Sequence, residues 1–232
     1  MPFEDTITRN IAVRKGIYVL SGVITELGKP GVAVDDVFVL VQEDAGSVEK
    51  TLMSAKTGAG SNRYSVILEV DKNYKFSFKK EGYFANNFGF TTKGLGQVDS
   101  VKKDVELNKL ELNKEYTLQN VLYEFGKSTL TENSKAVLDI LYNILVENPT
   151  FEIELSAHTD AIGSDAANLK LSQARAEACV AYLISKGIVK TRLVPKGYGE
   201  SKPKVPNQTE EGKDDPAGRA VNRRTEFKII KS

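Results

Sequence analysis

The chain has 232 residues, 41% of them hydrophobic and 27% charged, which is ordinary usage for a globular protein and predicts packed cores. Its 32 Lys and Arg residues against 31 Asp and Glu leave a net charge of +1, which excludes a broad basic field for nucleic acid or for a membrane surface. The length favours two compact domains, and no stretch approaches the length of a membrane span.

The first half of the chain has the composition of strands and turns. Segments rich in Val, Ile, Tyr and Phe read YVLSGVIT, VDDVFVLVQ, RYSVILEV and NYKFSFKKEGYF, and they are separated by ELGKPG, EDAG and TGAGSN. Short strands at this spacing predict an antiparallel β-sandwich over residues 18–110, after a leader segment of residues 1–17. Residues 108–118 are charged and lack Gly and Pro, which fits either a linker or a final strand, and we place a linker at 111–117.

The second half of the chain has the pattern of helices joined by strands. Thr131 is placed to cap a helix whose apolar residues recur at helical spacing until Pro149. Ser164 is placed to cap a second helix over residues 165–186, and Gly187 is placed to end it.

Alternating apolar and polar residues predict strands around these helices. FEIELSA and RRTEFKII have the period of a half-buried strand, and RLVPKGYG completes the set. With a further strand before the first helix, the order predicts an α+β domain of βαβαββ type over residues 118–232, in which two helices cover a mixed sheet.

The stretch SAHTDAIGSDAANLKLSQARA contains the only histidine of the chain, His158, close to Asp160. Two residues apart on one strand, these side chains point to the same face, and no cysteine or nucleophile elbow accompanies them. A lone histidine also lacks the ligand set of a metal site. We therefore predict that His158 is structural, and that the chain is not an enzyme and carries no metal or other cofactor.

The same stretch is better suited to holding a ligand. On a helix that begins near residue 165, Asn168, Leu171 or Ser172, and Arg175 share one face, and Asp160 lies in the loop before it. Asp160 and Arg175 could then frame a zwitterion, one taking its ammonium and the other its carboxylate. They could equally pair with each other. The spacing leaves both arrangements open.

Four ordered blocks resemble the OmpA-like peptidoglycan-binding domain, which is shared by OmpA C-terminal domains, Pal lipoproteins and MotB. The blocks are HTD followed by N..LS..RA, then YLISKGI, GYGESKP and NRRTEF, and VLYEFGKSTLTENSKAVLDILYNIL resembles the opening strand and first helix of the family. The resemblance covers residues 118–232. It implies non-covalent binding of the meso-diaminopimelate of the peptidoglycan stem peptide.

The resemblance also implies which residues bind diaminopimelate. The family's ligand-binding aspartate is the last residue of the HTD block, and its ligand-binding arginine is the arginine of the LS..RA block. The other implied residues line the same pocket or its edge. These residues are Asp160, Arg175, Asn168, Leu171, Thr159, Phe125, Arg223 and Arg224.

Three positions depart from the family pattern. Ala157 stands where glycine is usual, and Gly126 stands where many Pal-type members carry aspartate. Extra residues, KDDPAGRA at 213–220, separate TEEG from NRR and predict a longer surface loop near the pocket, which changes the setting of Arg223 and Arg224.

The first half resembles the carboxypeptidase regulatory-like sandwich, a transthyretin-like fold common in envelope proteins of Bacteroidota. The resemblance rests on SGVITELGKPGVAVDDVFVLV and YSVILEVDKNYKFSFKKEGY, and it implies a spacer or a docking surface. The two domains in this order are similar to the C-terminal part of Bacteroidota envelope lipoproteins, some associated with type IX secretion. Such proteins need an export signal, which MPFEDTITRN does not resemble, so we expect a fragment of a longer lipoprotein.

The sequence thus predicts a periplasmic, cell-wall associated anchor. Its expected partner is peptidoglycan, and envelope proteins are possible partners of the β-sandwich, with no nucleic acid and no membrane span. The alternative is a docking module of an envelope complex, with a protein as its main ligand. A cell-wall hydrolase is disfavoured because the chain offers no nucleophile or metal set.

Overall fold

The computed structural model describes residues 16–44, 49–95, 100–119, 121, 123 and 126–232. The chain divides into two compact units, Met1–Lys109 and Leu110–Ser232. The predicted leader lies almost entirely outside the described residues. The domain boundaries taken from the sequence stay a prediction, and each unit is described by itself.

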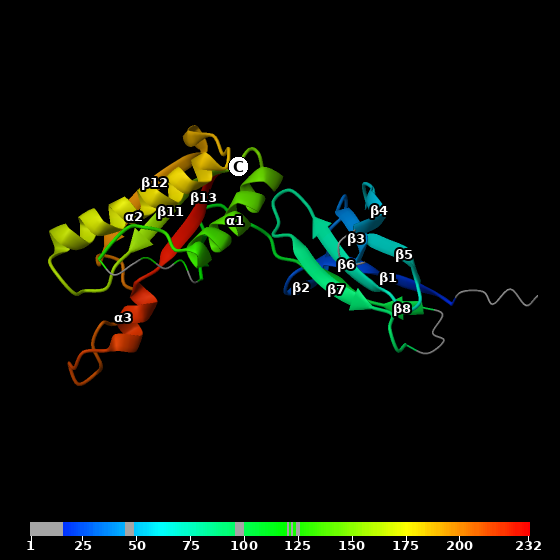
Figure 1. The fold of residues 1–232 in the computed structure, drawn as a ribbon, viewed down its shortest axis with the longest axis horizontal. Helices are drawn as coiled ribbons and strands as arrows, with labels where there is room; N and C mark the ends of the chain where they lie inside the picture. Colours follow the sequence, from blue (N-terminus) through cyan, green and yellow to red (C-terminus); the bar gives the residue numbers. More distant parts are fainter. Residues whose placement is uncertain (1–15, 45–48, 96–99, 120, 122, 124–125) are drawn as a thin grey trace, which may run out of the picture. The chain divides into compact units, whose positions relative to one another are not determined.

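The first unit consists of two β-sheets (Figure 1). The first sheet contains β1 (Ile17–Glu26), β2 (Lys29–Ala33), β5 (Arg63–Glu69), β8 (Ser100–Lys102) and β9 (Val105–Leu107). The second contains β4 (Glu49–Lys56), β3 (Phe38–Asp44), β6 (Asn73–Lys79) and β7 (Asn86–Thr91), in this order across the sheet. Strands β1, β3, β5 and β6 overlap the four segments whose composition predicted strands.

Alternation along these strands builds one core. In β3, β5 and β6 every second residue is buried, as expected for strands with one face turned inward. A single cluster of buried side chains draws on both sheets, with Leu20 and Leu68 from the first and Val39 and Phe78 from the second. The similarity to carboxypeptidase regulatory-like modules stays a prediction.

The prediction of purely antiparallel pairing is wrong for two strands of this unit. Strands β8 and β9 both pair with β1 in parallel. The chain reaches β8 from β7 of the other sheet, so it joins β1 by a crossover instead of a tight hairpin. A composition pattern cannot distinguish these two connections.

The second unit is an α+β structure around a four-stranded mixed sheet. The strands are β10 (Glu115–Leu118), β13 (Thr225–Lys231), β11 (Glu152–His158) and β12 (Leu193–Gly199), in this order across the sheet. Only β11 and β12 run parallel to each other. The helices are α1 (Glu132–Glu147), α2 (Asp165–Ser185), the short 3-10 helix η1 (Lys190–Arg192) and α3 (Pro216–Asn222).

The two long helices begin and end at the predicted residues. The Thr131 hydroxyl accepts a hydrogen bond from the Ser134 N–H at 3.2 Å, and the Ser164 hydroxyl accepts one from the Ala167 N–H at 3.4 Å. After α2, Gly187 adopts a φ of 107°, a conformation that side chains disfavour. The capping signals in the sequence are confirmed.

Two further elements of this unit differ from the sequence prediction. Strand β10 covers part of the predicted linker 111–117, and it pairs with β13, where the rings of Tyr116 and Phe227 stack with centroids 5.2 Å apart. Helix α3 lies in the predicted surface loop, so the expectation of two helices is wrong. Asp215 caps α3 by accepting a hydrogen bond from the Ala217 N–H at 3.0 Å, and Pro216 occupies the first turn.

The packing of α2 positions the candidate site. Helix α2 lies against β11 and β12, and α1 packs beside α2 (Figure 1). The start of α2 is thereby held next to the end of β11, and the loop between them is short. Within the described ranges, no helix has the length and apolar character needed to cross a membrane.

Candidate ligand pocket

A pocket of about 530 Å³ lies beyond the carboxyl end of β11. It is enclosed by the loop after β11, the first half of α2, and α3 with the residue that follows it. The lining residues are Gly126, Thr159, Asp160, Ile162, Gly163, Ala167, Asn168, Leu171, Arg175, Arg219 and Arg223. Polar and charged groups thus face an aliphatic wall.

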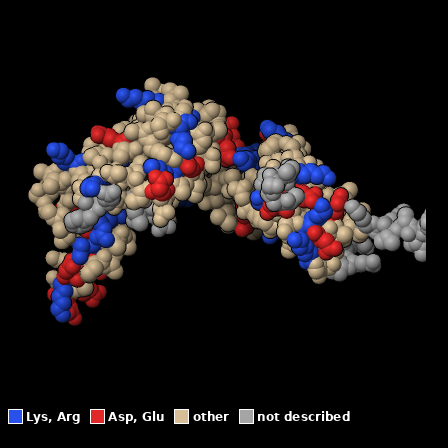
Figure 2. Space-filling view, in the orientation of Figure 1, with Lys and Arg blue, Asp and Glu red and all other residues tan. Residues whose placement is uncertain are grey.

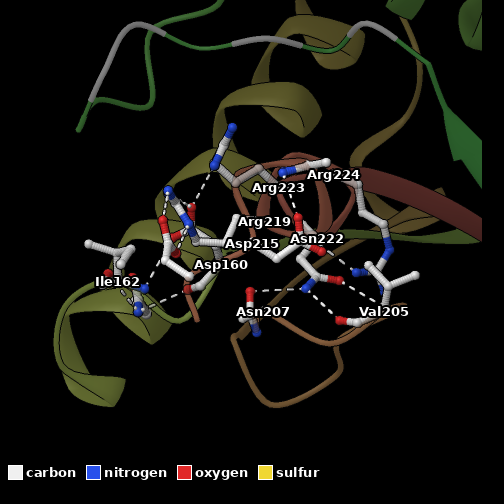
Figure 3. Close-up of polar contacts among 12 residues, drawn as sticks. Asp160, Ile162, Val205, Asn207, Asp215, Arg219, Asn222, Arg223 and Arg224 are labelled. Carbon is white, nitrogen blue, oxygen red and sulfur yellow. Dashed lines mark hydrogen bonds and ion pairs between the residues drawn. The ribbon is translucent and has the colours of Figure 1, made fainter. Parts of the chain in front are cut away.

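The Asp160 carboxylate is held by groups from two elements (Figure 3). One oxygen, Oδ2, lies 2.6 Å from Arg223 Nη1 and 3.5 Å from Arg219 Nη1. The other, Oδ1, accepts a hydrogen bond from the Ile162 N–H at 3.2 Å. Burial acts to raise the pKa of Asp160, but the bonds from Arg223 and Ile162 outweigh it, so the pKa lies below its usual value. Asp160 is therefore ionised at neutral pH.

Arg175 enters the pocket from α2, and among the described residues it has no ion-pair partner. Its Nε donates to the Lys127 carbonyl at 3.1 Å, and its guanidinium carbon lies 4.6 Å from the centre of the Tyr123 ring. Only 8% of the side chain is exposed. Burial lowers the pKa of Arg175, although the group stays charged at neutral pH. The mutual bridge between Asp160 and Arg175, left open by the spacing, is absent from the described residues.

Asn168 and Leu171 lie on the face of α2 that the spacing predicted. Leu171 contributes to the aliphatic wall, whereas the Asn168 amide is used within the protein. Its Nδ2 donates to the carbonyls of Asp160 at 3.3 Å and Ile162 at 3.2 Å, and it also contacts the Glu200 carboxylate. Asn168 therefore holds the loop that carries Asp160.

The structure describes Thr159 but not Phe125. Thr159 is 5% exposed and lines the pocket, and its Oγ1 has no hydrogen-bond partner among the described protein atoms. Phe125 lies outside the described residues, and its role at the edge of the pocket stays a prediction.

Arg219 is a pocket residue that the sequence did not predict. Its Nε and Nη2 each donate to an Asp214 carboxylate oxygen, at 2.8 and 2.9 Å, and its Nη1 faces Asp160. The signal was present in the spacing, because Arg219 and Arg223 are four residues apart and α3 brings them to one side. The extra residues 213–220 thus belong to the site. Figure 2 shows acidic and basic atoms side by side over this segment.

Arg224 does not line this pocket. The side chains of neighbouring residues in an extended chain point in opposite directions. Arg223 points to Asp160, and Arg224 therefore points into the interior of the protein. It donates to the Lys202 carbonyl at 3.0 Å and lies 3.1 Å from the Glu226 carboxylate. Arg224 therefore lies outside the group of residues that surrounds Asp160.

His158 belongs to a buried charged cluster around Glu226. Its Nε2 lies 3.2 Å from Glu226 Oε2, and the ring stacks on Tyr198. Within the part of the chain that the structure describes, neither ring nitrogen has a partner with hydrogen-bond geometry. Glu226 is fully buried and also contacts Lys204 at 2.5 Å. Burial acts to raise its pKa, but His158, Lys204 and Arg224 lower it well below the usual range. The histidine is a structural residue at the end of β11.

The chemistry of the pocket suits binding. Its described lining residues include no histidine, serine or cysteine. In the described ranges, no three His, Cys, Asp or Glu side chains are grouped so that they could hold a metal ion. Fixed cations, one carboxylate and an aliphatic wall define a ligand-binding domain of the α+β class.

Comparison with known families identifies this domain. Residues 122–215 match the OmpA family model, and this part of the chain is an OmpA family domain. Domains of this family are non-enzymatic, peptidoglycan-binding anchors of the cell envelope. Their homologues lie in the outer membrane or the periplasm.

Individual relatives match the same half of the chain. Over 110 residues the chain is 40% identical to Outer membrane porin F of Pseudomonas fluorescens. The aligned region covers 47% of this chain and 32% of that protein. Over 111 residues it is 40% identical to Photosystem I P700 chlorophyll a apoprotein A2 of Gloeobacter violaceus, covering 48% of this chain and 13% of that protein. The chain thus spans a third or less of the length of these relatives.

A solved structure also aligns with this half of the chain. A MotB-like protein from Desulfovibrio vulgaris is 28% identical, over 50% of this chain and 70% of that chain, with a TM-score of 0.42.

Proposed function

We propose that this protein binds peptidoglycan without cleaving it, through the meso-diaminopimelate of the stem peptide. In this role it anchors an outer-membrane or periplasmic assembly to the cell wall. Membership of residues 122–215 in the OmpA family supports the class of ligand. The observation that carries the proposal is Arg175, a buried guanidinium without an ion pair in the described residues, in the same pocket as Asp160.

The pocket offers a matching group for each part of diaminopimelate. The free end of this residue carries an ammonium and a carboxylate on one carbon, and an aliphatic chain leads to it. Arg175 has two terminal amino groups available to hold a carboxylate. Asp160 supplies the opposite charge, and Leu171 and Ile162 supply apolar surface for the chain.

A single stem peptide is expected to bind weakly. One zwitterion in an open pocket corresponds to a dissociation constant on the order of micromolar to millimolar, or about −8 to −4 kcal/mol. Many copies of the ligand in one sacculus raise the effective concentration, so that retention comes from avidity. Such binding suits a protein that stays in the periplasm beside the wall.

Sedimentation with purified sacculi tests this function. The wild-type protein should pellet with diaminopimelate-type sacculi, and Arg175→Ala should remain largely in the supernatant because it loses the unpaired guanidinium. Asp160→Ala should also reduce pelleting, since Asp160 holds Arg223 and Arg219 in place. Lys170→Ala is the matched control, because it removes an exposed positive charge from the same helix outside the pocket.

Other outcomes would favour other functions. Equal pelleting of all four proteins would contradict the pocket assignment, and release of soluble muropeptides would indicate a hydrolase. Absence of pelleting would favour a docking module with a protein ligand. One observation supports that second candidate: a groove of about 540 Å³ on the first unit, lined by Phe84, Phe88 and Lys103 among others.

A further inference from the structure

Strand β5 forms one edge of the first sheet. Among the described strands it pairs only with β1, and the pairing is antiparallel. The Ile24 N–H donates to the Asn62 carbonyl at 2.7 Å, and hydrogen-bonded pairs alternate along an antiparallel ladder. The peptide groups of Ser65 and Ile67 therefore point away from β1. Within the described ranges, no other segment forms hydrogen bonds with them.

The side chains of β5 alternate between the core and solvent. Every second residue is buried, and Ser65 and Ile67 lie on the opposite, exposed face. Ile67 is 64% exposed, more than any other large apolar side chain that the structure describes. An exposed isoleucine beside outward-pointing peptide groups is suited to pairing with a further strand.

Several other edge strands carry features that hinder such pairing. Strand β2 contains Pro30, β12 contains Pro195, and β7 contains Gly89. Strand β4 has an irregular register with β3 between Val41 and Gln42. Proline removes a hydrogen-bond donor, glycine weakens a strand, and a bulge redirects an edge. Strand β5 has no proline, glycine, lysine or bulge.

The two ends of β5, whose sequence is RYSVILE, carry opposite charges. Arg63 is exposed, and no ion pair joins it to another described residue. When a second β5 lies antiparallel with Val66 on the two-fold axis, Arg63 of each copy faces Glu69 of the other. Parallel pairing in register would instead place like charges side by side. The charges of β5 thus complement those of a second, antiparallel copy.

The same arrangement also satisfies the backbone and the exposed isoleucine. Ser65 of each copy faces Ile67 of the other, so their outward peptide groups can bond to each other. The two Ile67 side chains become diagonal neighbours, about 7–8 Å apart at their backbones and within reach of each other. Apolar surface is thereby buried next to the axis.

We propose that two copies of this protein associate by antiparallel pairing of their β5 strands, which joins their first sheets into one continuous sheet. The new ladder ends before Glu69, because the Tyr74 hydroxyl accepts the Glu69 N–H at 2.9 Å and the Thr92 hydroxyl donates to the Glu69 carbonyl at 2.8 Å. The interface is therefore short, and we expect a dissociation constant on the order of 10–100 μM. With the proposed function, a dimer presents two wall-binding domains, which increases its retention on a sacculus.

Sedimentation velocity of the full chain between about 5 and 500 μM tests the dimer. The wild type should pass from monomer to dimer over this range. Ile67→Lys should raise the dissociation constant at least about 30-fold, because it places two like charges beside the axis. Ile140→Lys is the matched control, since Ile140 is 61% exposed and lies on α1 of the other unit. Circular dichroism checks that each variant keeps its fold.

Exchange of the two charges tests the antiparallel register. Arg63→Glu and Glu69→Arg should each weaken self-association at least about fivefold, because each places like charges opposite one another. An equimolar mixture of these two variants should associate with a dissociation constant within about threefold of the wild type. The Arg–Glu pairs form again between the two unlike copies.

Three outcomes would overturn the proposal. The first is a wild-type protein that stays monomeric at about 500 μM, and the second is a dimer that Ile67→Lys leaves as stable as before. The third is a mixture of Arg63→Glu and Glu69→Arg that associates no better than either variant alone.

Discussion

Asp160 and Arg175 are both in the pocket, but their surroundings are unequal. Their spacing on the chain allowed a mutual bridge or a shared ligand, and neither arrangement includes Arg223. The bond between Arg223 and Asp160 joins residues 63 positions apart, so no local pattern reveals it. Individual side chains of this site were therefore predictable as candidates, whereas their pairing was not.

The buried Glu226 leads to a prediction about acid stability. His158, Lys204 and Arg224 hold its pKa below its ordinary value of 4.5. A carboxyl group whose pKa is lowered by folding stabilises the protein above its unfolded pKa, and this contribution is lost as the pH falls towards the folded pKa. The free energy of unfolding should therefore fall from about pH 5 downward.

Substitution of Glu226 tests the predicted direction of this pH dependence. Glu226→Gln leaves the buried Arg224 without its carboxylate partner and removes the contact with the partly exposed Lys204. The free energy of unfolding should therefore fall by about 3 kcal/mol at pH 7 and depend less on pH below 5. Thermal unfolding followed by circular dichroism between pH 7 and 2.5 measures both effects. Glu132→Gln, at a carboxylate that is 87% exposed, should behave as wild type. If the free energy of unfolding of Glu226→Gln fell with pH as steeply as that of the wild type, Glu226 would not be the source of the pH dependence.

At the level of elements, α3 decides where two of the three pocket arginines lie. Its position depends on Asn222, whose side chain is fully buried. The Asn222 Oδ1 accepts from the N–H groups of Lys204 and Val205 at 2.8 and 3.2 Å, and Nδ2 donates to the Val205 carbonyl and to Asn207 Oδ1. Figure 3 shows these bonds beside the arginines.

Asn222→Ala should therefore destabilise α3 and also weaken ligand binding in the pocket. The backbone groups left unpaired predict a loss of about 2 kcal/mol in the free energy of unfolding, measured in urea. The dissociation constant for a stem peptide that contains diaminopimelate should rise about fivefold or more, since Arg219 and Arg223 lose their fixed positions. Asn133→Ala, at an exposed position in the first turn of α1, is the control. An unchanged dissociation constant would show that α3 does not position Arg219 and Arg223.

At the level of the whole molecule, the chain forms two compact units. Each contains a glycine where another chain segment passes very close. A Cβ on Gly22 would lie 2.0 Å from the Lys103 carbonyl oxygen, and one on Gly197 would lie 2.3 Å from the Gln173 backbone nitrogen. Neither backbone contact can be relieved by a side-chain rotation.

These two positions test the predicted division into domains. Gly22→Ala and Gly197→Ala should each cost about 2 kcal/mol or more, or on the order of 10 °C in the unfolding temperature of a unit of this size. If the units are separate domains, calorimetry should give two transitions, and each substitution should lower only one of them. A single transition lowered by both substitutions would contradict two independent domains.

The sequence by itself determined the long helices, most strands and the family of the second half. Helical spacing with capping by Thr131 and Ser164, strand alternation and turn residues all act over a few neighbouring positions, so they can be identified locally. Tertiary structure alone decided the parallel pairing of β8 and β9, the place of β10 in the sheet, and the arginines that surround Asp160. These features join residues far apart in the chain, and their contacts form only when the sheets and α3 pack.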